Sequence, residues 1–266
     1  MNEPILVTGG TGTIGRRVVT LLHGAGHDVR VLSRRGGTDA PGIQHVVGDT
    51  HEGTGLDEAF AGASTVVHLA GGPKSDDVGA RHVVQAAQRA GTSHLLLISV
   101  IGAGDVPIGY VRMKGETERI VRESGVPFTI LRAAQLHSLL LPVASKLSSL
   151  RLAPRDVRLE PVDGEAVATR LAELALSGPS GRVADIAGPE VLTFADLVAQ
   201  YNAHRGLTRR VMRMPVPGAL GRAYRDGTNL ASAPVDRMGS TWQQFLEGAD
   251  PMTTARPDKA ASGRAA

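Results

Sequence analysis

The chain has 266 residues, of which 42% are hydrophobic and 21% charged, and its formal net charge is +3. This composition is typical of a globular protein with one large domain or two unequal ones. The absence of cysteine excludes disulfides, thiolate nucleophiles and cysteine metal sites. No signal peptide is visible, and the longest apolar run, Leu95 to Ala103, is too short to span a membrane. We therefore expect a cytoplasmic protein without membrane contact.

The basic residues are scattered along the chain, with no run longer than two, although the isoelectric point is about 9.6. Clustering of basic residues, rather than a high isoelectric point, marks a nucleic-acid surface. The nine histidines also lack the spacing of metal ligands. The sequence therefore favours a small-molecule substrate over a nucleic acid, and it predicts no metal site.

Apolar strands and amphipathic helices alternate along the first half of the chain. Strands are predicted at residues 5–7, 28–33, 42–49, 64–71, 94–102 and 127–133, and helices at 14–25, 76–91 and 110–124. Alternation of this kind is typical of an α/β fold with a doubly wound parallel sheet.

The pattern becomes irregular past about residue 135. Helices are predicted at residues 165–176 and 194–206, the second with Thr193 as its N-cap, and a short strand at 182–188. Shorter helical pieces are expected within residues 215–227 and 240–248. The expected division is a parallel-sheet core at 1–135, the remaining sheet and helix elements with a small lobe at 136–249, and a mobile tail at 250–266.

The segment "TGGTGTIG" (residues 8–15) contains Gly10-x-Gly12-x-x-Gly15 and also Gly9-x-x-Gly12-x-x-Gly15. It follows a predicted strand and opens a predicted helix, which is the context that makes this motif informative. Glycines allow a tight turn and a close approach of the backbone to a pyrophosphate, and the helix N-terminus then holds the negative charge. The segment predicts dinucleotide binding.

The end of the second strand indicates which dinucleotide is bound. NAD sites place an acidic residue there to bind the ribose 2′-hydroxyl, whereas this chain has Ser33, Arg34 and Arg35. Two guanidiniums suit a 2′-phosphate, which favours NADP(H), with NAD(H) possible. Asp49, which closes the third strand, is suited either to accept a hydrogen bond from the adenine amino group or to cap the next turn.

Tyr110 and Lys114, in "YVRMK", lie four residues apart on a predicted helix and therefore share one face. A phenol is a weak acid at neutral pH, and a nearby ammonium stabilises its phenolate. Tyr110 is then able to give a proton to a carbonyl oxygen as hydride arrives at the carbon. Ser99, at the end of the fifth strand, is expected to hydrogen-bond the same oxygen.

Together, "TGGTGTIG", "SRR", "GD", "ISVIG" and "YVRMKGETERIVRESGVPFTILRAAQLH" resemble the atypical short-chain dehydrogenase/reductases of the NmrA-like NAD(P)-binding type. The resemblance extends more weakly over nearly the whole chain before the tail, and it implies a Rossmann-like, dinucleotide-binding core with a small C-terminal substrate-binding lobe and NADP(H) as the ligand. It implies that Ser99, Tyr110 and Lys114 form the catalytic triad, with Lys114 also binding the nicotinamide ribose. The implied cofactor-binding residues are Gly9, Thr11, Gly12, Thr13, Ile14 and Gly15 at the pyrophosphate, Ser33, Arg34 and Arg35 at the adenosine phosphate, Asp49 at the adenine, Ala70 and Gly71 at the ribose, and Ala133 to Gln135 at the carboxamide.

Two features bear on the activity that this resemblance implies. The fourth strand ends in "HLAGG", where classical members carry an asparagine, and His68 within it is expected to be a structural residue. Some NmrA-like relatives lack the tyrosine and sense dinucleotides without turnover, whereas this chain keeps all three triad residues.

The sequence thus predicts an NADPH-dependent reductase of a small, largely apolar carbonyl, quinone or enone, acting as a monomer or homodimer. An NADP(H)-sensing regulator and an epimerase or dehydratase are the alternatives. His137 is expected to pack rather than to react. The candidate pocket walls are Leu136, Leu139, Leu140, Trp242 and Phe245.

Overall fold

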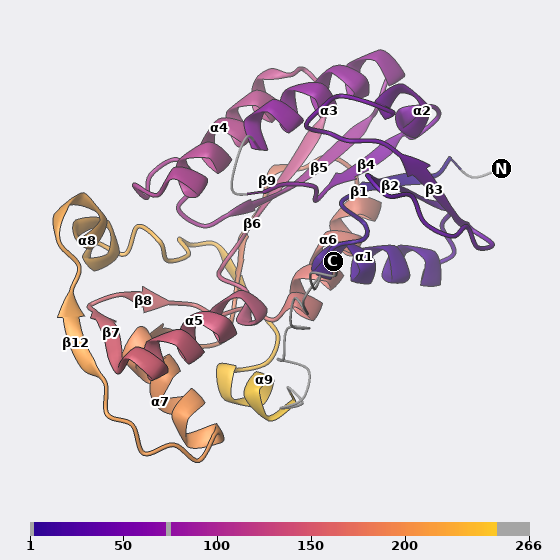
Figure 1. Ribbon diagram of the computed structural model, residues 1–266. Helices are drawn as coiled ribbons and strands as arrows, with labels where there is room; N and C mark the ends of the chain where they lie inside the picture. Colours follow the sequence, from indigo (N-terminus) through magenta and orange to yellow (C-terminus); the bar gives the residue numbers. More distant parts are fainter. Residues whose placement is uncertain (1–2, 73–75, 249–266) are drawn as a thin grey trace, which may run out of the picture.

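A nine-stranded sheet forms the centre of the molecule in the computed structural model, which describes residues 3–72 and 76–248 (Figure 1). Its strands are β1 (Ile5–Thr8), β2 (Val29–Ser33), β3 (Ile43–Val47), β4 (Thr65–His68), β5 (His94–Val100), β6 (Phe128–Ala133), β9 (Gly181–Arg182), β10 (Asp185–Ala187) and β13 (Val235–Arg237). The strand order is β13-β10-β6-β5-β4-β1-β2-β3, with β9 also paired to β6, and every pair is parallel.

The central strands are apolar because helices cover both faces of the sheet. Leu95, Leu96 and Leu97 are fully buried in succession, so β5 shows no alternation of buried and exposed residues. Helices α1 (Thr13–Gly24) and α6 (Gly164–Ser177) cover one face, and α2 (Leu56–Phe60), α3 (Asp76–Ala90) and α4 (Gly109–Glu123) cover the other (Figure 1). The predicted α/β fold with a parallel, Rossmann-like sheet is confirmed.

The order of the strands indicates where a ligand is expected to bind. From β3 to β6 it reads 3-2-1-4-5-6, and it reverses between β1 and β4. In open parallel sheets, ligands bind outside the carboxyl ends of the strands at such a reversal. The glycine-rich turn after β1, the end of β2 and the end of β4 therefore border one crevice.

A second group of segments forms a lobe with its own apolar cluster. Its elements are α5 (His137–Leu150), β7 (Leu152–Arg155), β8 (Arg158–Leu159), β11 (Leu192–Thr193), α7 (Phe194–His204), β12 (Met212–Pro215), α8 (Gly218–Arg225) and α9 (Trp242–Gly248). β7 pairs with β12, and β8 pairs with β11. Trp242, Leu197 and Leu140 are buried in its core. The predicted N-cap is confirmed, since the Thr193 side chain accepts a hydrogen bond from Asp196 N within a capping box.

Several lobe features differ from the sequence-based expectation. Helix α5 was not predicted, because its sequence is apolar on most faces and Pro142 lies inside it. Of the candidate pocket walls, Leu139 is 64% exposed and Trp242 is buried in the lobe core. His137 packs as expected, with ring centroids 5.7 Å from Trp242 and 4.9 Å from Phe245.

The expected tail at 250–266 lies outside the described residues. Among the described helices, none combines the length and the apolar character that crossing a membrane requires.

Candidate functional site

The turn between β1 and α1 has the shape that an anion-binding loop needs. Gly9 has a φ of +70°, and its carbonyl accepts the backbone N–H of Gly12, the N-cap of α1, at 2.9 Å. A Cβ on Gly15 would lie 2.1 Å from the Gly9 carbonyl oxygen, and one on Gly9 would lie 2.7 Å from Ala70 N. Glycine is therefore required at both positions, and α1 begins with its free N–H groups beside the crevice.

This crevice contains a cavity of about 860 Å³. Its lining residues are Gly9, Thr11, Gly12, Leu32, Ser33, Arg34, Gly48, Asp49, Thr50, His51, Glu52, Leu69, Ala70, Gly71, Gly72, Asp76 and Gly79. Eight predicted cofactor-binding residues are among them: Gly9, Thr11, Gly12, Ser33, Arg34, Asp49, Ala70 and Gly71. A cavity of this size suits a ligand as large as a dinucleotide.

The end of β2 presents one arginine to this cavity. Arg34 lines it, whereas Arg35, its neighbour in the sequence, does not. Ser33 is buried, and its hydroxyl donates to the Gly36 carbonyl at 2.8 Å, which holds the turn after β2. Asp49 Oδ1 accepts the backbone N–H of His51 at 2.8 Å, so Asp49 caps this turn while it lines the cavity.

Helix α4 carries the predicted catalytic pair. The Lys114 ammonium lies 5.9 Å from the centroid of the Tyr110 ring, which confirms that both side chains share one face of the helix. Lys114 is buried and forms an ion pair with Asp76 Oδ2 at 2.8 Å, and it donates to the Ile98 carbonyl at 3.3 Å. Because Asp76 also lines the large cavity, this ion pair joins the cavity to the helix that carries Tyr110.

Ser99 belongs to a buried polar network under α4. Its hydroxyl donates to Glu118 Oε1 at 2.6 Å, and Ser99 is 1% exposed. Glu118, which is 0% exposed, also binds the Arg132 guanidinium through both carboxylate oxygens, at 2.7 and 2.8 Å. The Ser99 proton is therefore engaged by Glu118, and contact of Ser99 with a substrate oxygen stays a prediction.

His68, at the end of β4, lies near the ion pair between Lys114 and Asp76. Its Nδ1 is 2.7 Å from the Thr8 hydroxyl, and the ring is 2% exposed. Burial lowers the pKa of His68 from 6.5 to about 4, with the nearby Lys114 ammonium adding to the effect and the Asp76 carboxylate opposing it. His68 is thus a neutral, hydrogen-bonded strand residue at neutral pH, as the sequence indicated.

Acid is expected to destabilise the protein through His68. Between pH 6.5 and 4 the unfolded chain binds a proton at this position and the folded chain does not, so the free energy of unfolding decreases as the pH falls. At about 1.4 kcal/mol per pKa unit, the loss is roughly 3 kcal/mol by pH 4. Urea unfolding at pH 7 and pH 4.5 measures it, and His68→Asn is expected to reduce the difference. Exposed His204, replaced by Asn, is the control; equal pH dependence of both variants would contradict the assignment.

The other predicted cofactor-binding residues do not line the cavity. Thr13, Ile14 and Gly15 open α1, and Ala133 ends β6. Gln135 follows β6, and its buried side-chain oxygen Oε1 has no hydrogen-bond partner among the described residues. An unpaired amide oxygen suits a ligand that carries an amide N–H, which is consistent with the predicted carboxamide contact.

Sequence reasoning missed Asp76 and Glu118, the partners of two predicted catalytic residues. Asp76 begins α3, where an acidic residue is expected for the helix dipole alone. Glu118 lies four residues after Lys114, on the same face of α4, and this spacing is the one signal that it faces the sheet. Within residues 3–72 and 76–248, no three histidine or acidic side chains come together as metal ligands.

Comparison with known protein families shows which family the chain belongs to. Residues 9–146, which span the glycine turn, the cavity and α4, match a family described as NAD(P)H-binding. The chain belongs to this NAD(P)H-binding family. Among its relatives is the (4-alkanoyl-5-oxo-2,5-dihydrofuran-3-yl)methyl phosphate reductase of Streptomyces griseus, 33% identical over 227 residues, which cover 81% of this chain and 78% of the relative. The NAD(P)H azoreductase of Xenophilus azovorans is 27% identical, over 95% and 93% of the two chains.

Solved structures of similar fold include members with different activities. An NADPH-dependent quinone oxidoreductase of Escherichia coli in complex with NADPH has a TM-score of 0.74 and 19% identity, over 92% of this chain and 99% of that chain. A nucleoside-diphosphate-sugar epimerase of Staphylococcus aureus has a TM-score of 0.76 at the same identity and the same coverage. At this identity, the likeness establishes the Rossmann-like fold of the NAD(P)H-binding family and not an activity.

Proposed function

We propose that this protein is an NADPH-dependent oxidoreductase of the short-chain dehydrogenase/reductase type, close to the NmrA-like members. Its substrate is a small, largely apolar carbonyl, quinone or enone, and Tyr110 is the proton donor. The observation that carries this proposal is the continuity from the dinucleotide cavity through Asp76 and Lys114 to Tyr110. Two relatives, the (4-alkanoyl-5-oxo-2,5-dihydrofuran-3-yl)methyl phosphate reductase and the NAD(P)H azoreductase, support a reductase.

Each part of the crevice has a role in this proposal. The N–H groups at the start of α1 bind the pyrophosphate, Arg34 binds the 2′-phosphate, and the unpaired Gln135 oxygen accepts the carboxamide N–H. When bound, the cofactor supplies a hydride. Tyr110 donates the proton to the substrate oxygen, and the buried Lys114 ammonium stabilises the phenolate that remains. Asp76 holds the ammonium in place at 2.8 Å.

Arg34→Gln is expected to change the choice of cofactor. Loss of a charge-assisted contact to a phosphate weakens NADPH binding by about ten- to a hundredfold and leaves NADH binding nearly unchanged. Fluorescence titration of both cofactors measures the effect. The matched control is Arg35→Gln, because Arg35 is adjacent in sequence but does not line the cavity. Equal losses for NADPH and NADH in the Arg34 variant would contradict the proposed 2′-phosphate contact.

Turnover tests the proposed function directly. NADPH oxidation is followed with a panel of quinones, aldehydes, ketones and enones, and the products are identified. We expect oxidation with at least one class, and faster oxidation of NADPH than of NADH. Binding of NADPH without oxidation by any panel member would contradict the proposal as stated.

One observation favours a second candidate, an NADP(H)-sensing protein without turnover. The Ser99 hydroxyl and the Lys114 ammonium are both engaged by buried carboxylates, those of Glu118 and Asp76. In a sensor, these contacts would stabilise the fold around a bound dinucleotide. A reductase oxidises NADPH and loses this activity in the Tyr110→Phe variant, whereas a sensor binds NADPH without oxidising it in either form.

A further inference from the structure

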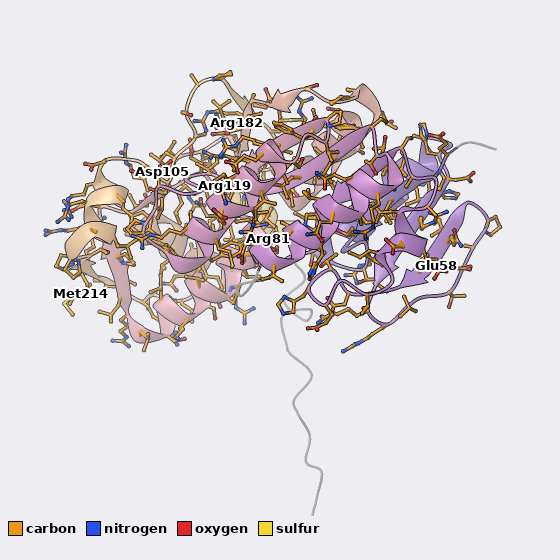
Figure 2. All side chains as sticks on the ribbon, turned by 90° about the horizontal axis from the view of Figure 1, so that it is seen from above. Glu58, Arg81, Asp105, Arg119, Arg182 and Met214 are labelled. Atoms are coloured by element: carbon orange, nitrogen blue, oxygen red, sulfur yellow. The ribbon has the colours of Figure 1, made fainter. Side chains whose placement is uncertain are left out.

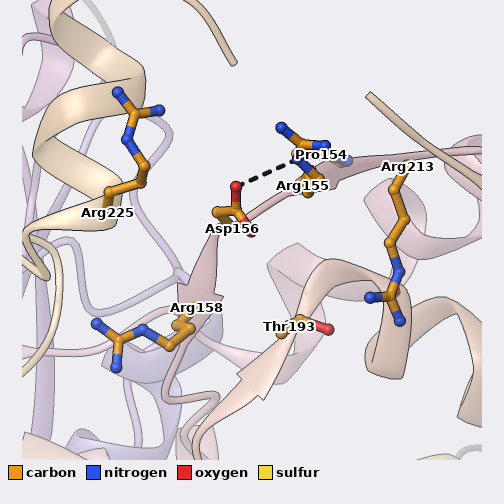
Figure 3. Close-up of a pocket in the computed structure, with 8 residues that line it drawn as sticks. Pro154, Arg155, Asp156, Arg158, Thr193, Arg213 and Arg225 are labelled. Carbon is orange, nitrogen blue, oxygen red and sulfur yellow. Dashed lines mark ion pairs between the residues drawn. The ribbon is translucent and has the colours of Figure 1, made fainter. Parts of the chain in front are cut away.

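A second cavity, of about 270 Å³, lies in the lobe, between the turn joining β7 to β8, strand β12, helix α8 and the first turn of α7 (Figure 3). Its lining residues are Pro154, Arg155, Asp156, Arg158, Thr193, Ala195, Arg213 and Arg225. Four of these eight side chains are guanidiniums and one is a carboxylate. The arginines come from the segment of β7 and β8, from β12 and from α8.

Most of this positive charge has no partner. Arg155 pairs with Asp156 at 3.3 Å, the contact marked by the dashed line in Figure 3. The side chains of Arg158, Arg213 and Arg225 form no ion pair or hydrogen bond within the described part of the chain. All four arginines are exposed to solvent, and a bound anion gains charge-assisted hydrogen bonds with them.

The charges that line this cavity favour a doubly negative ligand over a singly negative one. After the pairing of Arg155 with Asp156, three guanidiniums remain uncompensated. A phosphate ester carries between one and two negative charges at neutral pH and offers three acceptor oxygens, which guanidinium groups bind bidentately. Thr193 and Ala195, at the N-terminus of α7, also line the cavity.

The loop after α8 connects this cavity to the end of β5. A Cβ on Gly227 would lie 3.5 Å from Arg158 Nη2, and one on Gly102 would lie 2.9 Å from the Thr228 carbonyl oxygen. Asn229, which is buried in the same loop, donates from Nδ2 to the Arg158 carbonyl at 2.6 Å. Arg158 is therefore held against the loop that also contacts Gly102, three residues after Ser99.

We propose that the cavity formed by Arg155, Arg158, Arg213 and Arg225 binds the phosphate group of a phosphorylated small molecule. The substrate of the reductase carries this phosphate on a chain long enough to reach from the lobe to Tyr110; this second part rests on the proposed function. The phosphate subsite gives the largely apolar substrate a charged anchor that fixes its orientation.

Calorimetric titration with phenyl phosphate, with the full chain saturated with NADP⁺ so that the large cavity is filled, tests the proposal. We expect saturable binding that is at least about tenfold tighter than that of benzoate, since guanidiniums bind a dianion more strongly. The double variant Arg158→Gln/Arg213→Gln is expected to bind about tenfold or more weakly than the wild type. Arg222→Gln, on the same helix as Arg225 but outside the cavity, is the control and is expected to stay within about twofold.

The Asp156→Asn variant tests the proposal with an expected gain in binding, which a misfolded protein would not show. Removal of the one lining carboxylate is expected to tighten phenyl phosphate binding by about threefold, because Arg155 is then free for the ligand. Asparagine tolerates the left-handed backbone that Asp156 adopts, with a φ of 62°. Weaker binding by this variant, or equal binding by the wild type and the double arginine variant, would overturn the proposal.

Three further outcomes separate the alternatives. Absence of saturable phenyl phosphate binding overturns the inference, even if NADPH is oxidised with unphosphorylated carbonyls. Binding that depends on the arginines, without any NADPH oxidation, supports the subsite and contradicts the proposed function alone. Binding of a single-stranded oligonucleotide that the double variant loses, without binding of phenyl phosphate, would assign the arginines to nucleic acid and overturn the inference.

Discussion

Replacement of Tyr110 by phenylalanine is expected to lower the turnover number by about 10²- to 10⁴-fold, the usual contribution of a positioned proton donor. The phenylalanine ring keeps the packing next to Lys114, which lies 5.9 Å from the Tyr110 centroid, so NADPH affinity should change little. Steady-state rates with a panel substrate, together with NADPH titration, separate the two effects. A loss in turnover without a loss in cofactor binding assigns the proton transfer to the phenol.

The chain offers a matched control for this substitution. Tyr201 lies in α7, and its hydroxyl donates to Ser145 Oγ at 3.1 Å, remote from α4 in the sequence. Tyr201→Phe removes one hydroxyl of the same kind and should leave turnover within about twofold, since it removes one ordinary hydrogen bond. Equal turnover in the Tyr110→Phe variant and the wild type would exclude Tyr110 from the reaction.

The second large effect concerns the buried network below α4. Glu118→Ala is expected to lower the free energy of unfolding by about 3–5 kcal/mol, because it removes the buried carboxylate that binds the Arg132 guanidinium through both of its oxygens. The Ser99 hydroxyl also loses its acceptor. For a protein of this length, the loss corresponds to a decrease of about 10 °C in melting temperature, which calorimetry measures.

Glu116 is the matched control for Glu118, because it lies on the same helix two residues earlier. Its partners, Arg81 on α3 and Arg119 on α4, lie on the outer helical layer that Figure 2 shows from above. Exposed ion pairs contribute little, so Glu116→Ala should cost less than about 1 kcal/mol. Similar losses in the two variants would contradict the account of a buried network.

The sequence allowed the fold to be predicted because its signals were local. The glycine turn, the apolar strands and the Thr193 cap each depend on residues close together in the chain. The same holds for the eight predicted residues that line the large cavity, which lie at or just after the carboxyl ends of strands that meet at one edge. Tyr110 and Lys114 were predictable as a pair because a single helix turn brings them together.

Features that depend on distant contacts could not be predicted. The engagement of Ser99 by Glu118 and of Lys114 by Asp76 requires knowledge of how α3 and α4 pack on the sheet. The basic residues were correctly described as scattered along the chain, yet folding gathers Arg158, Arg213 and Arg225 around one cavity. Helix α5 was not predicted because its apolar residues do not recur at clear helical spacing and Pro142 lies among them.

The fate of the cofactor's hydrogen tests the central claim most directly. With NADPH deuterated at the transferring position of the nicotinamide and a panel substrate, we expect one deuterium on the reduced carbon of the product for each NADPH consumed. This result would establish a reductase. Product formed without net NADPH consumption, as in an epimerase or dehydratase, or NADPH bound without any deuterium transfer, as in a sensor, would contradict it.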